Sequence, residues 1–239
     1  MLGPVILRYF SLLFSAPQAF VILVAAFTVS MLLGLIFHEF CHAAVANWLG
    51  DPTPRRAGRL TLNPRAHYDP VGTTLIFLVG FGWAKPVPVN PNYTANPKRS
   101  MLLISLAGPA SNLVVAAIAG LPIRFGLLPF TGTLFASSLN DPIVLVGLFF
   151  GTVLNLNVVL AVFNMLPIFP LDGSKVLLGL LPDSLAREYQ KLEPWGMGIL
   201  MVIIVLPFLT GGAASLFSVI GPVVGFFLWL FSGASVVFG

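Results

Sequence analysis

The sequence predicts an all-α polytopic membrane protein, and three of its features indicate this class. Apolar residues make up 57% of the 239 residues and charged residues only 8%, whereas a soluble domain carries about 25% charged residues. Several apolar runs reach the ~20 residues that a membrane-spanning helix needs. The basic residues lie mostly between these runs. We therefore expect a single membrane-embedded domain over residues 1–239, with five to six transmembrane helices and the lipid bilayer as its solvent.

The first two apolar segments differ in how well they fit a spanning helix. Residues 1–14 contain Arg8 in mid-segment, so we expect a short interfacial or re-entrant helix rather than a signal peptide, which would carry its charge first. Residues 19–37 form a clean apolar run that continues into HEFCHAAVANWLG. One helix is predicted through to Trp48, with Gly50 ending it.

The segment that follows is too irregular for a span. Residues 51–70 are polar and rich in arginine, and the apolar run 71–82 is too short to cross ~30 Å of hydrocarbon. Prolines at positions 86, 88 and 91 then bar a helix, and their alternation with valine suits an extended edge strand. We expect a short β or re-entrant element between the first two main spans, with its strand in residues 85–93.

Two more spans and a closing hairpin account for the rest of the chain. Residues 101–121 and 143–166 are apolar enough to be the second and third spans. A core of about residues 19–180 would then be completed by a C-terminal helical hairpin over about residues 195–238.

The positive charges predict an orientation. Residues 51–100 hold seven of the 12 lysines and arginines, and residues 172–196 hold three more. If both segments face one side, the positive-inside rule makes that side the cytoplasm of a multi-pass protein in the cell membrane. The ends of the first and third spans would then both lie near the cytoplasmic face. Because the basic residues are scattered between apolar spans and indicate topology, no nucleic-acid partner is expected.

The motif HEFCH at residues 38–42 is the strongest chemical signal. Residues four apart share a helix face, so His38 and His42 can point two imidazoles at one metal ion with Glu39 beside them. Such a site needs one more protein ligand and a position open to water. An ionised carboxylate within the bilayer costs about 2.5–3.5 kcal/mol, which favours a functional role for Glu39. If the third ligand is a carboxylate, two histidines and that carboxylate favour a single Zn²⁺ ion over other divalent metals.

Together with later motifs, HEFCH makes the sequence resemble the site-2 protease family of intramembrane zinc metalloproteases. The matching pieces are HEFCH, GDPTP (50–54), GRLTLNPRAHYDPVG (58–72), FGWAKPVPVNP (81–91), LAGPASN (106–112) and NMLPIFPLDG (164–173). They cover roughly residues 34–180 and are most similar to small microbial members that consist of a membrane core. The resemblance implies a hydrolase of regulated intramembrane proteolysis, a metalloprotease whose substrates are transmembrane segments of other proteins.

The resemblance also implies roles for residues outside HEFCH. Asp172 would be the third metal ligand, although Asp-Gly also favours a simple turn. His67 could replace it, but we expect His67 to lie on a water-exposed loop. Asn164 would face the substrate or the transition state, and capping of its helix end is an equal alternative. Asn112 has the same implied role, and its alternative is an interhelical hydrogen bond.

In the expected reaction, Glu39 takes a proton from a water held by the metal and passes it to the leaving amine. Residues 85–93 would pair with the unwound substrate by β-augmentation or cover the mouth of the site. Two other functions stay open. A polytopic metal-ion transporter should show internal symmetry, which we do not find, and an inactive membrane scaffold would have no need of Glu39. The sequence does not indicate an oligomeric state.

Overall fold

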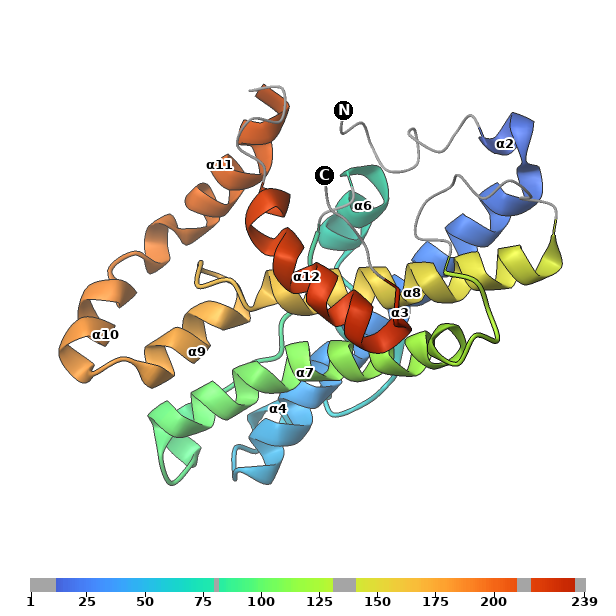
Figure 1. The fold of residues 1–239 in the computed structure, drawn as a ribbon. Helices are drawn as coiled ribbons and strands as arrows, with labels where there is room; N and C mark the ends of the chain where they lie inside the picture. The colour runs from blue at the N-terminus through green and yellow to red at the C-terminus, as the bar shows by residue number, and fades with distance from the viewer. Residues whose placement is uncertain (1–11, 80–81, 131–140, 210–215, 235–239) are drawn as a thin grey trace.

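The computed structural model describes residues 12–79, 82–130, 141–209 and 216–234, and these ranges form an all-helical protein (Figure 1). The predicted all-α class is confirmed. Most of the interfacial helix expected at residues 1–14 lies outside the described residues, and only α2 (Leu12–Ser15) is seen from it.

The longest helix, α3 (Pro17–Trp48), runs without a break from the first span into the HEFCH motif. Pro17 fits the start of the helix because the first turn needs no backbone N–H from it. Gly50 follows with a φ of 104°, a left-handed conformation that ends helices. The prediction of one helix through to Trp48 is therefore confirmed, and the chemical motif sits in the last third of a membrane-spanning element.

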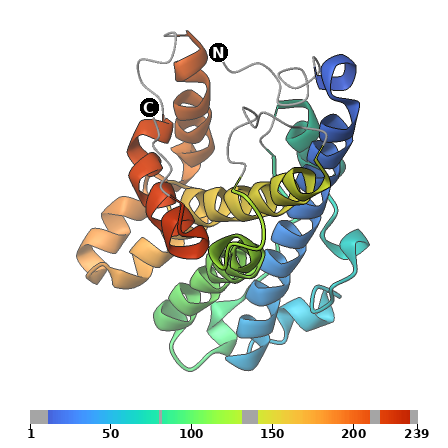
Figure 2. The same ribbon diagram turned by 45° about the vertical axis from the view of Figure 1, so that its right-hand side comes forward.

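Three helices form the centre of the molecule. Helices α7 (Pro97–Arg124) and α8 (Pro142–Asn164) pack on each other, and both pack on α3. Each begins with a capped turn: the Asn96 side chain accepts a hydrogen bond from the backbone of Arg99, and that of Asp141 accepts one from Ile143. In Figures 1 and 2, α7 runs opposite to α8, as consecutive spans should.

The polar segment after α3 folds back as short helices and an extended stretch. These elements are α4 (Thr53–Arg56), α5 (Pro64–His67), α6 (Pro70–Val79) and the 3-10 helix η1 (Pro91–Tyr93). No strand occurs within the described ranges, so the β-strand predicted for residues 85–93 is wrong.

The backbone of this stretch explains why it is not a strand. Pro86 and Pro88 have no N–H to offer to a ladder. The N–H groups of Lys85, Val87 and Asn90 donate instead to three separate acceptors. The acceptors are the carbonyl of His67 and the carboxylates of Glu39 and Asp51. A substrate that paired with residues 85–93 would therefore find no preformed strand there.

The C-terminal part adds helices on one side of the core. They are α9 (Asp172–Leu180), α10 (Asp183–Gln190), the 3-10 helix η2 (Glu193–Trp195), α11 (Gly196–Leu209) and α12 (Leu216–Ser232). Helix α12 packs on α7 and α8, and its buried Val224 and Leu228 share one apolar cluster with Leu154 and Val158 of α8. This last helix is thus part of the core.

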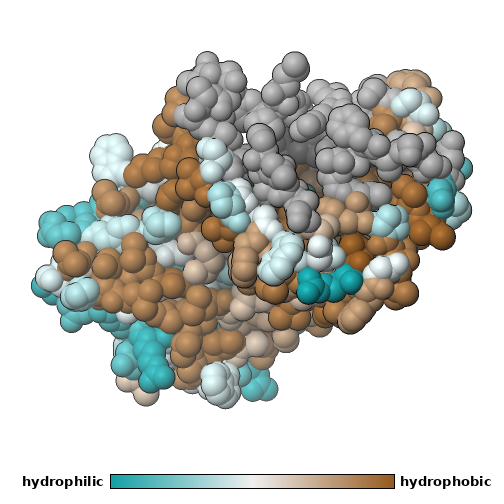
Figure 3. All heavy atoms as spheres, in the orientation of Figure 1, coloured by the Kyte–Doolittle hydropathy of each residue, from teal (hydrophilic) through white to brown (hydrophobic). Residues whose placement is uncertain are grey.

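The surface and the helix lengths identify a membrane protein. Within the described residues, four helices are long and apolar enough to cross a bilayer: Pro17–Trp48, Pro97–Arg124, Pro142–Asn164 and Asp183–Leu206. The apolar helix Ser218–Ser232 is shorter. Figure 3 shows a broad hydrophobic face, with hydrophilic residues gathered at the end where α10 and the start of α7 lie.

Candidate metal centre

Two imidazoles from one helix and a carboxylate from another meet between α3, α7 and α9. His38 and His42 are 6% and 7% exposed, and their ring centroids are 4.6 Å apart at an interplanar angle of 86°. Their Nε2 atoms lie 3.0 and 3.1 Å from Oδ2 of Asp172. Three side chains separated by up to 134 positions in sequence therefore point their donor atoms at one place.

A tight turn between α8 and α9 delivers Asp172. Helix α8 ends at Asn164, and α9 begins with Asp172 itself. A Cβ on the next residue, Gly173, would lie 2.2 Å from the carbonyl oxygen of Met165, closer than real atoms approach. Only glycine lets the chain fold back this closely. The carboxylate is thereby held at the buried start of α9, with 7% of the residue exposed.

The cluster fits a metal ion in both size and chemistry. The ligand atoms of His38, His42 and Asp172 all lie within 4.8 Å of one another. Their separations from Asp172 approach the ~3.3 Å edge of a tetrahedron with bonds of about 2.0–2.1 Å, the zinc–ligand distance. Two histidines and one carboxylate form a catalytic zinc set that leaves a fourth position open. These residues can hold one zinc ion.

Helix α7 leaves space for that ion at Gly108. A Cβ there would lie 2.5 Å from Nε2 of His42 and 2.6 Å from Nε2 of His38. Any larger residue at position 108 would place a carbon atom in the space toward which the Nε2 atoms of His38 and His42 point. The sequence alone indicates only that Gly108 is a small residue that lets helices approach each other. Its position against the two histidine rings is known only from the structure.

The outer nitrogen of each histidine is also bound. Nδ1 of His42 lies 2.6 Å from the carbonyl oxygen of Ile104, and Nδ1 of His38 lies 2.7 Å from Oδ1 of Asn112. A carbonyl can only accept, so His42 donates from Nδ1 and keeps the Nε2 lone pair for a metal. Metal-binding histidines are usually held in this way.

Glu39 lies beside the pair on the same helix. Its Oε2 accepts a hydrogen bond of 3.2 Å from the backbone N–H of Val87, in the extended stretch after α6. The side chain is half-buried, unlike those of the two histidines. The extended stretch therefore fixes one oxygen of a carboxylate that directly follows His38 in the chain.

The other predicted residues lie in three different settings. Asn112 contacts His38 directly, as described above. Asn164 donates from Nδ2 to the carbonyl of Leu160 on its own helix, so its role toward a substrate stays a prediction. His67 is outside the cluster.

The expectation of a water-exposed His67 is wrong. The residue is 3% exposed, and its Nε2 lies 2.8 Å from the carbonyl oxygen of Thr61. The reason is that α5, which carries His67, packs against α3, so this side chain is covered although Arg65 on the same short helix stays exposed.

Sequence reasoning missed two residues near the centre. Asn157 of α8 is fully buried and donates to the carbonyl of Val153. An asparagine in the middle of an apolar span is itself a signal, since polar groups are costly there. Lys175, with Nζ 3.9 Å from Oδ1 of Asp172, could have been found from its i,i+3 spacing to Asp172.

Comparison with known proteins gives one family. The profile described as Peptidase family M50 matches residues 26–207. The chain is 37% identical over 183 residues to YwhC of Bacillus subtilis (strain 168), covering 75% of this chain and 80% of the relative. The search of solved structures gave no significant match.

Rip2 of Mycobacterium tuberculosis (strain H37Rv) is 33% identical over 201 residues, which is 80% of this chain and 70% of that protein. The names of both relatives describe zinc metalloproteases. The matched region contains every residue of the histidine–aspartate cluster and its neighbouring glutamate. This chain therefore belongs to peptidase family M50, the family of the site-2 proteases.

Proposed function

We propose that this protein is an intramembrane zinc metalloprotease that hydrolyses peptide bonds in or near transmembrane segments of other membrane proteins. The observation that carries the proposal is the convergence of His38, His42 and Asp172 beside Glu39, at the end of a helix that spans the membrane. Membership of a peptidase family supports it independently.

Each residue has a chemical task in this proposal. A zinc ion, when bound, supplies Lewis acidity toward water and the scissile carbonyl. His38, His42 and Asp172 hold the ion. Glu39 accepts a proton from the attacking water and delivers it to the leaving amine. The N–H of Val87 occupies Oε2 of Glu39, which leaves Oε1 to take the proton.

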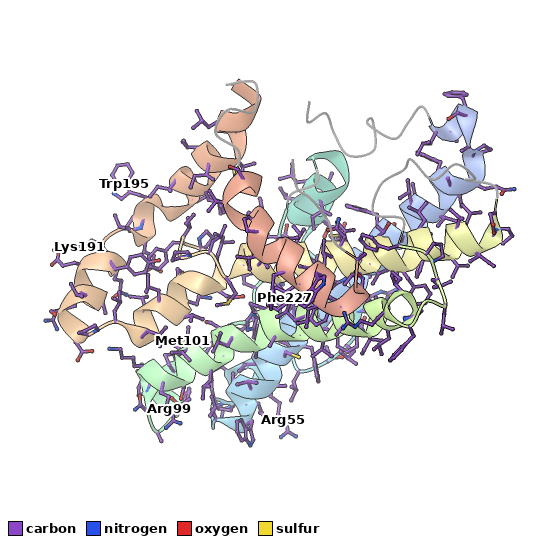
Figure 4. All side chains as sticks on the ribbon, in the orientation of Figure 1. Arg55, Arg99, Met101, Lys191, Trp195 and Phe227 are labelled. Carbon is purple, nitrogen blue, oxygen red and sulfur yellow. The ribbon has the colours of Figure 1, made fainter. Side chains whose placement is uncertain are left out.

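The distribution of charge supports an active site toward the cytoplasmic face of the cell membrane. Figure 4 shows Arg99 and Lys191 at the end of the molecule where α7 begins, and Arg55 just beyond the end of α3. The HEFCH motif lies in the last third of α3, near this basic end. Under the positive-inside rule, that end faces the cytoplasm.

Replacement of Glu39 by Gln tests the function. The purified full-length variant should bind zinc like the unmodified protein but lose about 10²- to 10⁴-fold in cleavage of a membrane-peptide substrate, because a general base contributes that much. Metal content is measured by elemental analysis and cleavage by mass spectrometry in liposomes, with and without a chelator.

Three results would count against this function. They are cleavage retained by Glu39→Gln, an unmodified protein without bound metal, and zinc flux across the liposome without cleavage. The last would favour a transporter.

A further inference from the structure

A chain of buried polar side chains runs behind the metal cluster and joins three helices. His38 of α3 contacts Asn112 of α7, with 2.7 Å between Nδ1 and Oδ1. Nδ2 of Asn112 lies 3.2 Å from Oδ1 of Asn157 on α8. The two asparagines are 1% and 0% exposed. Uncharged polar groups so deep among apolar spans need a reason to be there.

The direction of every hydrogen bond in this chain is determined by backbone carbonyls. Nδ2 of Asn157 donates to the carbonyl of Val153 at 2.9 Å, and Nδ2 of Asn112 donates to that of Gly34 at 3.0 Å. A carbonyl only accepts, so both amides must present Nδ2 there. Oδ1 of Asn112 is then left facing His38.

The orientation of the amides fixes the tautomer of the histidine. Since Oδ1 of Asn112 can only accept, Nδ1 of His38 must carry the hydrogen. Its Nε2 then keeps a lone pair directed toward Asp172, and a metal ion would lie between these two ligands. All the donors point away from the cluster, from His38 to Asn112 to Asn157, an arrangement in which successive bonds strengthen one another.

The packing allows little freedom for another arrangement. A Cβ on Gly34 would lie 2.9 Å from Oδ1 of Asn157 and 3.3 Å from Nδ2 of Asn112. The backbone of α3 therefore lies directly against both amides. Among the described residues, the Asn157 side chain hydrogen-bonds to Val153 and Asn112 and to none of the three ligands, so it reaches His38 only through Asn112.

We propose that Asn157 is a positioning residue for the metal site: acting through Asn112, it holds His38 in the tautomer and orientation that bind the ion. This inference rests on the metal centre of the proposed function. It assigns a task to an α8 residue that lies between the fully buried Leu154 and Val158 of the apolar cluster.

The test is a double-mutant cycle on zinc affinity with the full-length protein in detergent. Asn112→Leu, Asn157→Leu and the double variant are titrated with zinc alone in competition with a chromophoric chelator. Asn112→Leu should weaken binding about 10- to 100-fold, the usual effect of losing a partner of a metal ligand. Asn157→Leu should weaken it by about tenfold. The double variant should equal Asn112→Leu alone, because the second residue works only through the first.

Two further variants separate positioning from simple stability. Asn155→Leu, two residues away on α8 and only half-buried, is the matched control and should leave the zinc Kd unchanged. Asn157→Asp keeps an oxygen that can accept from Asn112 and, in its acid form, a hydroxyl that can donate to Val153, so it should restore the affinity. The Co²⁺-substituted protein gives a second readout, since its visible spectrum reports ligand geometry and should change in Asn157→Leu.

The inference is overturned if Asn157→Leu binds zinc and gives a Co²⁺ spectrum as the unmodified protein does. Fully additive losses in the cycle, or an Asn157→Asp variant as weak as Asn157→Leu, also overturn it. If Asn157→Leu does not fold, the smaller change Asn157→Ala takes its place: it must weaken zinc binding to the same extent, and normal binding overturns the inference. A protein that binds no zinc before any substitution would instead refute the proposed function.

Discussion

The two histidines of HEFCH are held in the same tautomer by different hydrogen-bond partners. His42 is fixed by a backbone carbonyl, which no substitution removes. His38 is fixed by the side chain of Asn112, which a mutation can change. The metal site is therefore more vulnerable to mutation on its His38 side.

Gly108 gives a prediction at this scale. In Gly108→Ala the new methyl group would lie within 2.6 Å of both metal-binding nitrogens, so we expect zinc affinity to fall by more than the ~100-fold that outer contacts cost. Cleavage should disappear with it. Isothermal titration with zinc measures the effect.

A second glycine provides the control for this variant. Gly198→Ala adds a methyl group where no atom lies within 4 Å, and it should bind zinc normally. Undiminished affinity in Gly108→Ala would mean that the metal is not held against α7.

Most of the metal-binding set could be predicted at the residue scale, but its surroundings could not. The i,i+4 spacing of His38 and His42 is fixed by helix geometry, so the sequence alone reveals that pair. The partners on α7 and α8 depend on which helix faces which. Asn157 and Gly108 look like ordinary residues of an apolar span until those helices are packed.

At the scale of elements, the turn between α8 and α9 is the connection that assembles the metal site. It brings a carboxylate from beyond the third span to imidazoles on the first. The Asp-Gly pair in the sequence favours a turn at this place, and the structure shows that glycine is needed there. The physical reason is the close approach of Gly173 to the carbonyl of Met165, since this glycine has no positive φ.

Gly173→Ala should therefore disturb both the turn and the metal. The methyl group would meet backbone atoms that cannot rotate away, and overpacking of this kind costs about 1–3 kcal/mol. We expect a lower thermal midpoint for the metal-free protein and weaker zinc binding. Differential scanning fluorimetry in detergent and zinc titration measure the two effects.

The comparison with Gly108→Ala makes this variant informative. The methyl group of Gly108→Ala meets imidazole rings and not backbone, so its metal-free midpoint should fall less than that of Gly173→Ala, while its zinc affinity should fall further. A normal midpoint in Gly173→Ala would show that the turn tolerates a side chain.

The extended stretch after α6 marks the limit of prediction for elements. Alternation of valine and proline indicates extended backbone, and the backbone of residues 82–90 has no helix. Pattern alone cannot say whether a neighbouring strand exists. Here the available N–H groups bond to Glu39, to Asp51 and to the carbonyl of His67, and no sheet forms among the described residues.

At the scale of the whole molecule, the three central spans and their alternating directions could be predicted from hydropathy and charge. The number of spans could not, because the last helices are of marginal length. Helix α12 is shorter than a typical span yet contributes Val224 and Leu228 to the core. Such a helix is held by neighbours as well as by lipid, a property that composition does not reveal.

Orientation can be tested on the intact molecule. Cys41 is the only cysteine, so Cys41→Ser provides a background for Arg56→Cys, an exposed position just beyond the end of α3. A membrane-impermeant maleimide should label Arg56→Cys in inside-out vesicles and not in intact cells. Labelling from outside intact cells would reverse the proposed topology.

The unbroken helix α3 links the reaction centre to the lipid around it. Its 32 residues extend for about 48 Å at 1.5 Å per residue, well beyond the ~30 Å of a typical hydrocarbon layer. A helix with such an excess must tilt or protrude, and it does so differently in thin and thick membranes. Since His38, Glu39 and His42 are rigidly part of this rod, their depth below the headgroups follows bilayer thickness, and lipid chain length becomes a variable of the catalytic site.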